Sequence, residues 1–223
     1  LKNNHIIEGE QILHALFPNS SLWYLVKHRV RRYKKDEIIY QENDGAKSIF
    51  IIAEGRVKIG SLGQDNRDVI KSIFVENDIF GELVLTGELL RIDHASALED
   101  ETKLYEFYAE EVLDVMKDHS ALTNEVLNIL GARIKKNENR LASLLYKDAR
   151  TRIVDFIKNL AIEKGRKVGY ETLIKNHFTH KDMASLTGTS RQTVTTVLNG
   201  LKEKNIINFD RRRILIRDMA LLN

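Results

Sequence analysis

The side chains best suited to chemistry lie in TSRQTVTTVLN, residues 189–199, where hydrogen-bonding groups are dense. Arg191 can donate two hydrogen bonds to guanine, Gln192 can pair with adenine, and a threonine offers a hydroxyl or a methyl group to phosphate or thymine. At about 100° per residue, one helical face collects the polar set Arg191, Gln192, Thr195, Thr196 and Asn199. The opposite face collects Val194, Val197, Leu198 and Leu201. The stretch therefore predicts a helix that presents a polar face to the major groove of double-stranded DNA.

Capping signals place a second helix just before this one. Thr179 and Asp182 have the spacing of a capping box, and Gly188 supplies a tight turn. Thr189 and Gln192 have the spacing of another capping box. We therefore expect a helix-turn-helix over residues 178–201. An ordinary polar helical hairpin is the alternative.

Two short apolar runs, residues 206–209 and 214–216, flank the sequence DRRR at 210–213. They predict a two-stranded wing with an arginine-rich tip that contacts the phosphate backbone. The candidate DNA contacts are, in chain order, Thr179, Ser190, Arg191, Gln192, Thr195, Thr196, Asn199, Arg211, Arg212 and Arg213.

Charge is unevenly divided along the 223 residues. Residues 150–223 hold 15 Lys and Arg against seven Asp and Glu, a net charge of +8, whereas the preceding residues hold 20 against 25, a net charge of −5. A basic C-terminal domain after an acidic one is the pattern of a protein that meets nucleic acid. No apolar run is long enough to span a membrane and no signal peptide is evident, so we expect a cytoplasmic protein without a membrane partner.

Other chemistries find little support. The chain has no cysteine, which excludes disulfides, thiolate-bound zinc and an iron–sulfur cluster. A cupin-like enzyme needs several inward histidines, and residues 36–108 contain only His94. His177, His180 and Asp182 have metal-like spacing, but helix capping and phosphate contact explain them better. We therefore predict neither catalytic nor metal-binding residues, and leave open a haem held by one of the seven histidines.

The remaining elements would position this DNA-reading surface. Residues 36–108 alternate short apolar runs with turn pairs such as Asp44-Gly45 and Glu54-Gly55, which predicts a β-sandwich or roll. Residues 120–145 lack proline and carry a heptad seam, formed by Leu127, Leu130, Ile134, Asn137, Leu141 and Leu144. A lone asparagine on a seam fixes the register of a dimer, so we expect a homodimer; packing of the seam on the β domain is the alternative. Asp148 can cap a following helix over residues 150–161, which makes residues 146–148 a candidate hinge.

The segment GTSRQTVTTVLNGLKEKNII resembles the recognition segment of the Crp/Fnr family of transcription regulators. The resemblance extends over nearly the whole chain, through the Asp44-Gly45 to Gly55 region, FGEL at 80–83, ALED at 97–100, and Asp148 with Arg152 at the hinge. It implies an α+β chain: a cyclic-nucleotide-binding β-roll (jelly roll) over residues 1–118, a dimerisation helix and hinge over 119–147, and a winged helix-turn-helix over 148–223. It also implies a palindromic promoter site and contact with RNA polymerase.

The family's specificity trio is an arginine, the glutamate beside it and an arginine four positions further. Arg191 matches the first, whereas Gln192 and Thr196 replace the other two. We therefore predict half-sites that keep a guanine opposite Arg191, favour adenine over cytosine opposite Gln192, and lie about 10 base pairs apart.

The sequence defines the small-molecule effector that would bind in the β-roll less clearly than the DNA contacts. Gly81, Glu82 and Arg91 match the residues that hold cyclic AMP in the family, but Ile92 replaces a hydroxyl residue and Asp93 follows it. The resemblance implies an effector site at Gly81, Glu82, Leu83, Arg91, Ile92, Asn137 and Glu138, the last two replacing hydroxyl residues. Cyclic AMP, another small effector, a haem-gated sensor and a ligand-binding scaffold without DNA binding all remain open. In the alternative structural roles, Glu82 caps its own loop and Arg91 pairs with Asp93.

Overall fold

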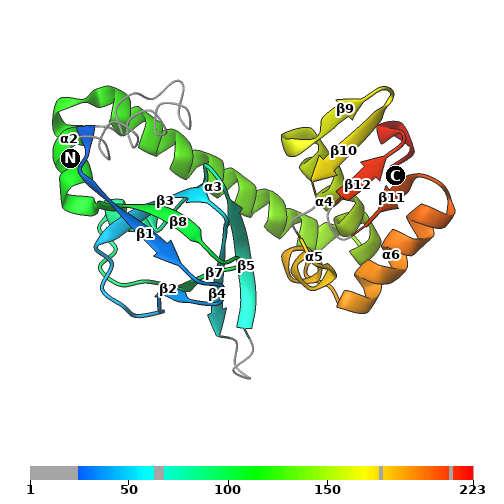
Figure 1. Ribbon diagram of the computed structural model, residues 1–223, viewed down its shortest axis with the longest axis horizontal. Helices are drawn as coiled ribbons and strands as arrows, with labels where there is room; N and C mark the ends of the chain where they lie inside the picture. Colours follow the sequence, from blue (N-terminus) through cyan, green and yellow to red (C-terminus); the bar gives the residue numbers. More distant parts are fainter. Residues whose placement is uncertain (1–24, 63–67, 176–177, 211–212, 223) are drawn as a thin grey trace. The chain divides into compact units, whose positions relative to one another are not determined.

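The computed structural model describes residues 25–62, 68–175, 178–210 and 213–222 (Figure 1). The chain forms two compact units, residues 1–135 and 136–223. The boundary lies inside the helix α3 (Ser120–Tyr146), whose extent agrees with the helix expected over residues 120–145.

The first unit contains two four-stranded antiparallel sheets in its described part, which is the expected β-roll. One sheet has the order β1 (His28–Tyr33), β8 (Thr102–Tyr108), β3 (Ser48–Glu54), β6 (Ile79–Phe80). The other has the order β2 (Ile38–Tyr40), β7 (His94–Ala97), β4 (Arg56–Leu62), β5 (Asp68–Val75). The short 3₁₀ helix η2 (Glu82–Thr86) follows β6, and α2 (Ala109–Asp118) follows β8.

Strand β3, with the sequence SIFIIAE, explains how the core divides. Its side chains alternate between two faces, and both faces are buried. Ile49 and Ile51 join the cluster that includes Leu122 and Val126 of α3. Phe50 joins a second cluster, in which it stacks on Phe80 with ring centroids 5.0 Å apart. One face of β3 therefore packs against the helices, and the other face packs against the second sheet.

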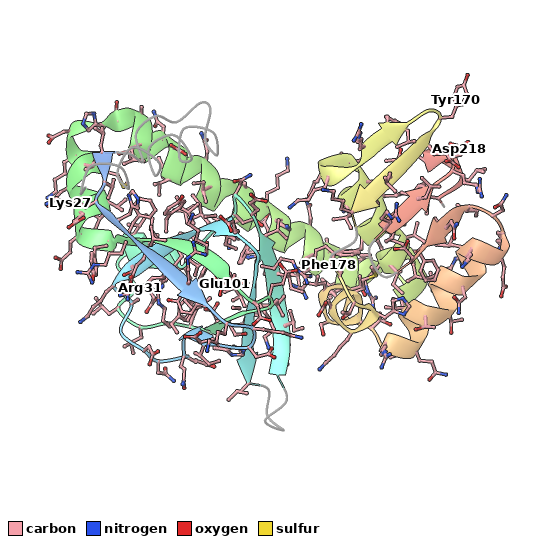
Figure 2. The ribbon with its side chains drawn as sticks, in the orientation of Figure 1. Lys27, Arg31, Glu101, Tyr170, Phe178 and Asp218 are labelled. Carbon is pink, nitrogen blue, oxygen red and sulfur yellow. The ribbon has the colours of Figure 1, made fainter. Side chains whose placement is uncertain are left out.

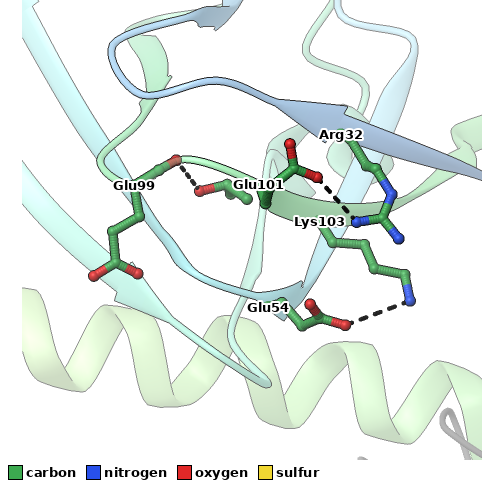
Figure 3. Close-up of polar contacts among 6 residues, drawn as sticks. Arg32, Glu54, Glu99, Glu101 and Lys103 are labelled. Atoms are coloured by element: carbon green, nitrogen blue, oxygen red, sulfur yellow. Dashed lines mark hydrogen bonds and ion pairs between the residues drawn. The ribbon is translucent and has the colours of Figure 1, made fainter.

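Two charged pairs join neighbouring parts of the first sheet (Figure 3). Arg32 on β1 lies 3.3 Å from Glu101, and Lys103 on β8 lies 3.6 Å from Glu54 at the end of β3. The Arg32–Glu101 pair is exposed on both sides, and such pairs stabilise a fold by about 1 kcal/mol or less. They support the register of the strands without forming a site.

Helix α3 leaves much of its apolar seam uncovered within a single chain. Leu127, Ile134 and Leu141 are 59–60% exposed. Leu130 is half-buried against the first unit's core, so it contributes to that core as well as to the predicted seam. No helix in the described residues is long and apolar enough to cross a membrane.

The second unit, beyond the C-terminal part of α3, is α4 (Ala149–Lys164), β9 (Arg166–Val168), β10 (Glu171–Lys175), α5 (His180–Thr187), α6 (Arg191–Glu203), β11 (Ile207–Phe209), β12 (Arg213–Ile216) and η3 (Met219–Leu221). Asp148 caps α4 by accepting the Thr151 amide at 2.7 Å, as expected. The helix is longer than the 150–161 expected. The wing sheet has four strands in the order β11-β12-β10-β9, whereas only β11 and β12 were predicted.

The apolar faces of the second unit meet in one core. Ile153 and Ile157 of α4 pack there with Val194, Leu198 and Leu201 of α6 and with Ile214 and Ile216 of β12. Phe178, labelled in Figure 2, lies edge-to-face on Phe156 of α4 with ring centroids 5.4 Å apart. The two helices of the predicted helix-turn-helix are therefore fixed to α4 and to the wing.

Candidate nucleic-acid interface and effector site

The turn between α5 and α6 has the local geometry that its sequence predicts. Thr179 and Asp182 form the expected capping box at the start of α5. Gly188 ends α5 with φ 62°, a left-handed conformation that glycine adopts without strain. The second capping box, predicted from Thr189 and Gln192, is wrong, because Ser190 is the N-cap of α6 and accepts the Thr193 amide at 3.0 Å. The Thr189 amide instead bonds to the Ala184 carbonyl and helps to end α5.

Helix α6 separates its apolar and polar faces as predicted. Val194, Val197, Leu198 and Leu201 are buried. Arg191, Gln192, Thr196 and Asn199 are exposed. Within the described part of the chain, the side chains of Gln192, Thr196 and Asn199 make no hydrogen bond or ion pair. Their donors and acceptors are therefore available to a partner.

Three of the predicted DNA-contacting hydroxyls already have partners inside the protein. Thr179 accepts the Asp182 amide at 3.1 Å, and Ser190 caps α6. The Thr195 hydroxyl donates to the Arg191 carbonyl at 2.9 Å and lies 2.9 Å from His180 Nδ1. The structure thus divides the predicted set into side chains that fix the helices and side chains that face outward.

The tip of the wing is only partly described. Arg211 and Arg212 lie outside the described residues. The Arg213 amide donates to Asp210 Oδ1 at 2.8 Å, and the Arg213 guanidinium lies 3.6 Å from Asp210 Oδ2. Asp210 therefore closes the turn between β11 and β12 and orients Arg213, whose side chain stays exposed.

Two arginines hold the carbonyl end of α5, next to the turn. Arg152 of α4 donates to the carbonyls of Thr187 at 2.7 Å, Gly188 at 3.0 Å and Lys147 at 2.7 Å. Arg140 of α3 donates to the Ser185 carbonyl at 3.2 Å. Arg152 was predicted as a hinge residue, and here it joins the hinge region to the helix-turn-helix. The role of Arg140 was not predicted, because nothing local in sequence marks its carbonyl partner.

The β-roll residues at the predicted effector site are tied together internally. Gly81 adopts φ 77° at the start of η2, and the buried Glu82 lies 3.1 Å from the Arg133 guanidinium of α3. Arg133 also donates to the Ile79 carbonyl at 2.8 Å and lies over the Phe74 ring. Among the described residues the Glu82 carboxylate pairs with Arg133 and has no bond within its own loop, so the capping alternative is wrong. Arg133 is missing from the predicted site, and its one sequence signal is its place one helical turn before Asn137.

Arg91 points into the protein. It is 7% exposed, and its two Nη atoms donate to the carbonyls of Ser48 at 2.6 Å and Gly81 at 3.1 Å. Its guanidinium lies over the Tyr40 ring, 4.3 Å from the centroid, and burial lowers the pKa of Arg91. The expected Arg91–Asp93 ion pair is wrong for these described residues, because Asp93 instead accepts the Tyr40 hydroxyl at 3.2 Å. Burial raises the pKa of the Asp93 carboxyl.

The other residues of the predicted effector site are exposed. Leu83 and Ile92 present apolar side chains at the surface of the β-roll. Asn137 and Glu138 lie exposed on the part of α3 that belongs to the second unit.

The comparisons with known proteins agree with this architecture. The family described as cyclic nucleotide-binding domain matches residues 30–119, and the Crp-like helix-turn-helix domain matches residues 139–223. The cyclic AMP receptor protein of Thermus thermophilus is 25% identical over 97% of this chain and 96% of its own length. The global nitrogen regulator of Nostoc is 26% identical over 87% of each chain. The solved structure of FixK2 from Bradyrhizobium japonicum covers 88% of this chain and 96% of its own with a TM-score of 0.78 at 21% identity.

The chain belongs to the Crp/Fnr family of transcription regulators. It is accordingly a DNA-binding regulator and not an enzyme, because that family consists of regulators.

In this Crp/Fnr regulator, several side chains that would meet a cyclic nucleotide are engaged within the protein or replaced. Each Nη of Arg91 already donates to a backbone carbonyl, whereas its buried Nε has no hydrogen-bond partner among the described residues. Ile92 has no hydroxyl. The Asp93 carboxylate nearby would repel a phosphate. Glu82, a potential acceptor for a ribose hydroxyl, is paired with Arg133. These residues therefore fit cyclic AMP poorly.

Nor do the described residues of this Crp/Fnr regulator hold a metal-binding cluster of His, Asp and Glu. His180 and Asp182, noted for their spacing, bond to Thr195 and to the Thr179 cap. His177 lies outside the described residues.

Proposed function

We propose that this regulator binds a palindromic promoter site as a homodimer, with α6 of each protomer in a major groove. The supporting observation is the exposed face of α6, where Gln192, Thr196 and Asn199 carry unused hydrogen-bonding groups beside the exposed Arg191. Short or planar side chains at the N-terminal half of a recognition helix suit base edges.

The homodimer is supported by the uncovered apolar side chains of α3. Leu127, Ile134 and Leu141 recur every seven residues, which is the repeat of a two-helix seam. A second copy of α3 would bury them, and Asn137 would set the register of the two helices. Leu144 is less exposed than these three, at 42%, because it packs beside Gly188 of the helix-turn-helix.

The proposed half-site has a guanine opposite Arg191 and an adenine opposite Gln192. Arginine pairs with O6 and N7 of guanine, and glutamine with N6 and N7 of adenine. Two-fold symmetry of the dimer calls for half-sites about 10 base pairs apart, centre to centre. On such a site we propose that the regulator contacts RNA polymerase, as the family resemblance implies.

We propose that a small molecule bound in the β-roll acts as an effector that modulates DNA binding. The Glu82–Arg133 pair supports this, because it joins the loop after β6 to α3, the helix that would dimerise. The residues around Arg91 favour an effector other than a cyclic nucleotide. Titration of cyclic AMP into the purified protein should give no saturable heat; micromolar binding that Arg91→Ala abolishes would contradict this assignment.

The test of the proposed function is selection of DNA sites from a random pool, followed by fluorescence anisotropy with the selected palindrome. Arg191→Ala should weaken specific binding by about fivefold or more per half-site, since a good bidentate contact contributes about 1–3 kcal/mol. Arg150→Ala is the matched control, because Arg150 is exposed on α4 and outside the helix-turn-helix. Equal losses in both variants would show that general charge, and not α6, accounts for binding.

A further inference from the structure

The Thr195 side chain is held by two helices of the second unit, α5 and α6. Its hydroxyl bonds to the Arg191 carbonyl one turn earlier in α6 and to His180 Nδ1 at the start of α5, each at 2.9 Å. The His180 ring in turn packs beside Phe209 of β11, with ring centroids 6.0 Å apart. Contacts with α5 and α6 thus determine the rotamer of Thr195, and the wing contributes through the packing of Phe209 beside His180.

The direction of these bonds follows from the number of protons. A threonine hydroxyl has one proton, and the Arg191 carbonyl can only accept. The hydroxyl therefore donates to that carbonyl, and His180 Nδ1 donates to the hydroxyl oxygen. Burial first, and the charge of Arg191 second, lower the pKa of His180, which favours the neutral ring. The bond to the Thr195 oxygen places the ring proton on Nδ1.

Thr195 occupies the centre of the face that meets DNA. Arg191, Thr195 and Asn199 follow one another at intervals of four residues and so form one ridge of α6. Thr195 is half-buried, and its hydroxyl is directed to the protein by both of its bonds. The group that remains for a base is its methyl. Thr196 differs, because its hydroxyl has no partner among the described residues.

We propose that Thr195 recognises thymine through methyl–methyl contact and that His180 is the positioning residue that turns the Thr195 methyl toward the groove. The C5-methyl group of thymine is exposed in the major groove, and threonine methyl groups pack against it. This inference rests on the proposed function, since it requires α6 to enter the groove. It adds a thymine to the guanine and adenine of the half-site.

The experiment replaces each thymine of the selected operator by deoxyuridine, which lacks only the methyl group. Affinity is measured by fluorescence anisotropy. At one symmetric position the wild-type protein should bind the deoxyuridine operator about fourfold more weakly per half-site, the equivalent of one buried methyl group of about 0.8 kcal/mol. Thr195→Ser keeps the hydroxyl and loses the methyl, so it should bind both operators equally. Thr195→Val keeps a methyl and should retain the preference for thymine.

His180→Phe tests the positioning role. Phenylalanine keeps ring packing near Phe209 but cannot donate to Thr195, so the preference for thymine should fall while overall DNA binding persists. Thermal unfolding of each variant establishes that the second unit is folded before affinities are compared.

The outcomes separate the inference from the proposed function. Wild-type protein that binds its palindrome without any preference for thymine over deoxyuridine overturns the inference alone. A Thr195→Ser variant that keeps the preference removes Thr195 as the reader, and a His180→Phe variant that keeps it removes His180 as the positioning residue. Failure of the wild type to select any DNA sequence would overturn the proposed function itself.

Discussion

At the scale of single residues, Arg91 shows how a residue of the effector motif can serve the fold. Two backbone carbonyls, of Ser48 and Gly81, depend on its guanidinium, and the rings of Tyr40 and Phe50 lie against it. The lysine ammonium has three donors on one nitrogen, which cannot occupy the positions of both Nη atoms that reach these carbonyls. We expect Arg91→Lys to destabilise the β-roll by about 2–3 kcal/mol in urea denaturation, since an unsatisfied buried acceptor costs about 1–3 kcal/mol.

The control for this prediction is Arg32→Lys. Arg32 is more than half exposed and pairs with Glu101 at 3.3 Å, a contact that lysine can also make (Figure 3). Its effect should stay below about 0.5 kcal/mol. Equal stability of wild type and Arg91→Lys would contradict the assigned role of Arg91.

Asp93 gives a prediction about pH. Burial raises its pKa above the usual 3.8, even though Lys71, Tyr40 and Arg91 favour the charged form. The folded state thus binds the proton more tightly than the unfolded state, so ionisation of Asp93 reduces stability as pH rises through its folded pKa. Asp93→Asn removes this loss and keeps a partner for Tyr40. The variant should be more stable than wild type at pH 7 and no more stable at pH 3. Thermal melts across this pH range measure the difference in melting temperature between the two proteins. A difference that stays constant with pH would refute the explanation.

At the scale of elements, Arg152 links α4 to the end of α5. Its guanidinium bonds to the carbonyls of Thr187, Gly188 and Lys147, so one side chain sets the position of the turn that precedes α6. Arg152→Lys can replace at most part of this set. We expect faster hydrogen exchange at the amides of the α5–α6 turn and about tenfold weaker DNA binding, because a charged hydrogen bond contributes about 1.5–3 kcal/mol.

Arg150→Lys is the matched control for Arg152→Lys, since it makes the same change on the same helix at an exposed position. If Arg152→Lys left amide hydrogen exchange in the α5–α6 turn unchanged, the contacts between Arg152 and the carbonyls would not be the cause of order in that turn.

At the scale of the whole molecule, the expected dimer depends on the α3 seam. Leu141→Lys places a charge on the seam, where a partner helix would bury it without a counter-ion. We expect the variant to be monomeric by light scattering and to bind a full palindrome no more tightly than a single half-site. Ile162→Lys makes a similar change on α4, where Ile162 is exposed and off the seam, and should leave the dimer intact. A Leu141→Lys variant that stays dimeric would place the interface elsewhere.

The sequence by itself determined the features that depend on local patterns. The length of α3, the capping box at Thr179, the left-handed Gly188 and the two faces of α6 all follow from the types and spacing of neighbouring residues. The charge division and the motif GTSRQTVTTVLNGLKEKNII likewise pointed to DNA and to the Crp/Fnr family before any coordinates.

Only the tertiary structure decided which side chains are free to meet a ligand. All three residues of β9 are exposed, so its sequence lacks the apolar alternation of a strand. β10 pairs with β9 and with the distant β12, and these two missed strands are ordered by their pairing. Arg91 bonds to Ser48, 43 residues away, and Arg133 to Glu82, so neither role has a local signal. The same holds for His180 and Thr195, 15 residues apart. A hydrogen bond between distant residues depends on how the elements pack, and packing is set by the whole core, not by the residues that bond.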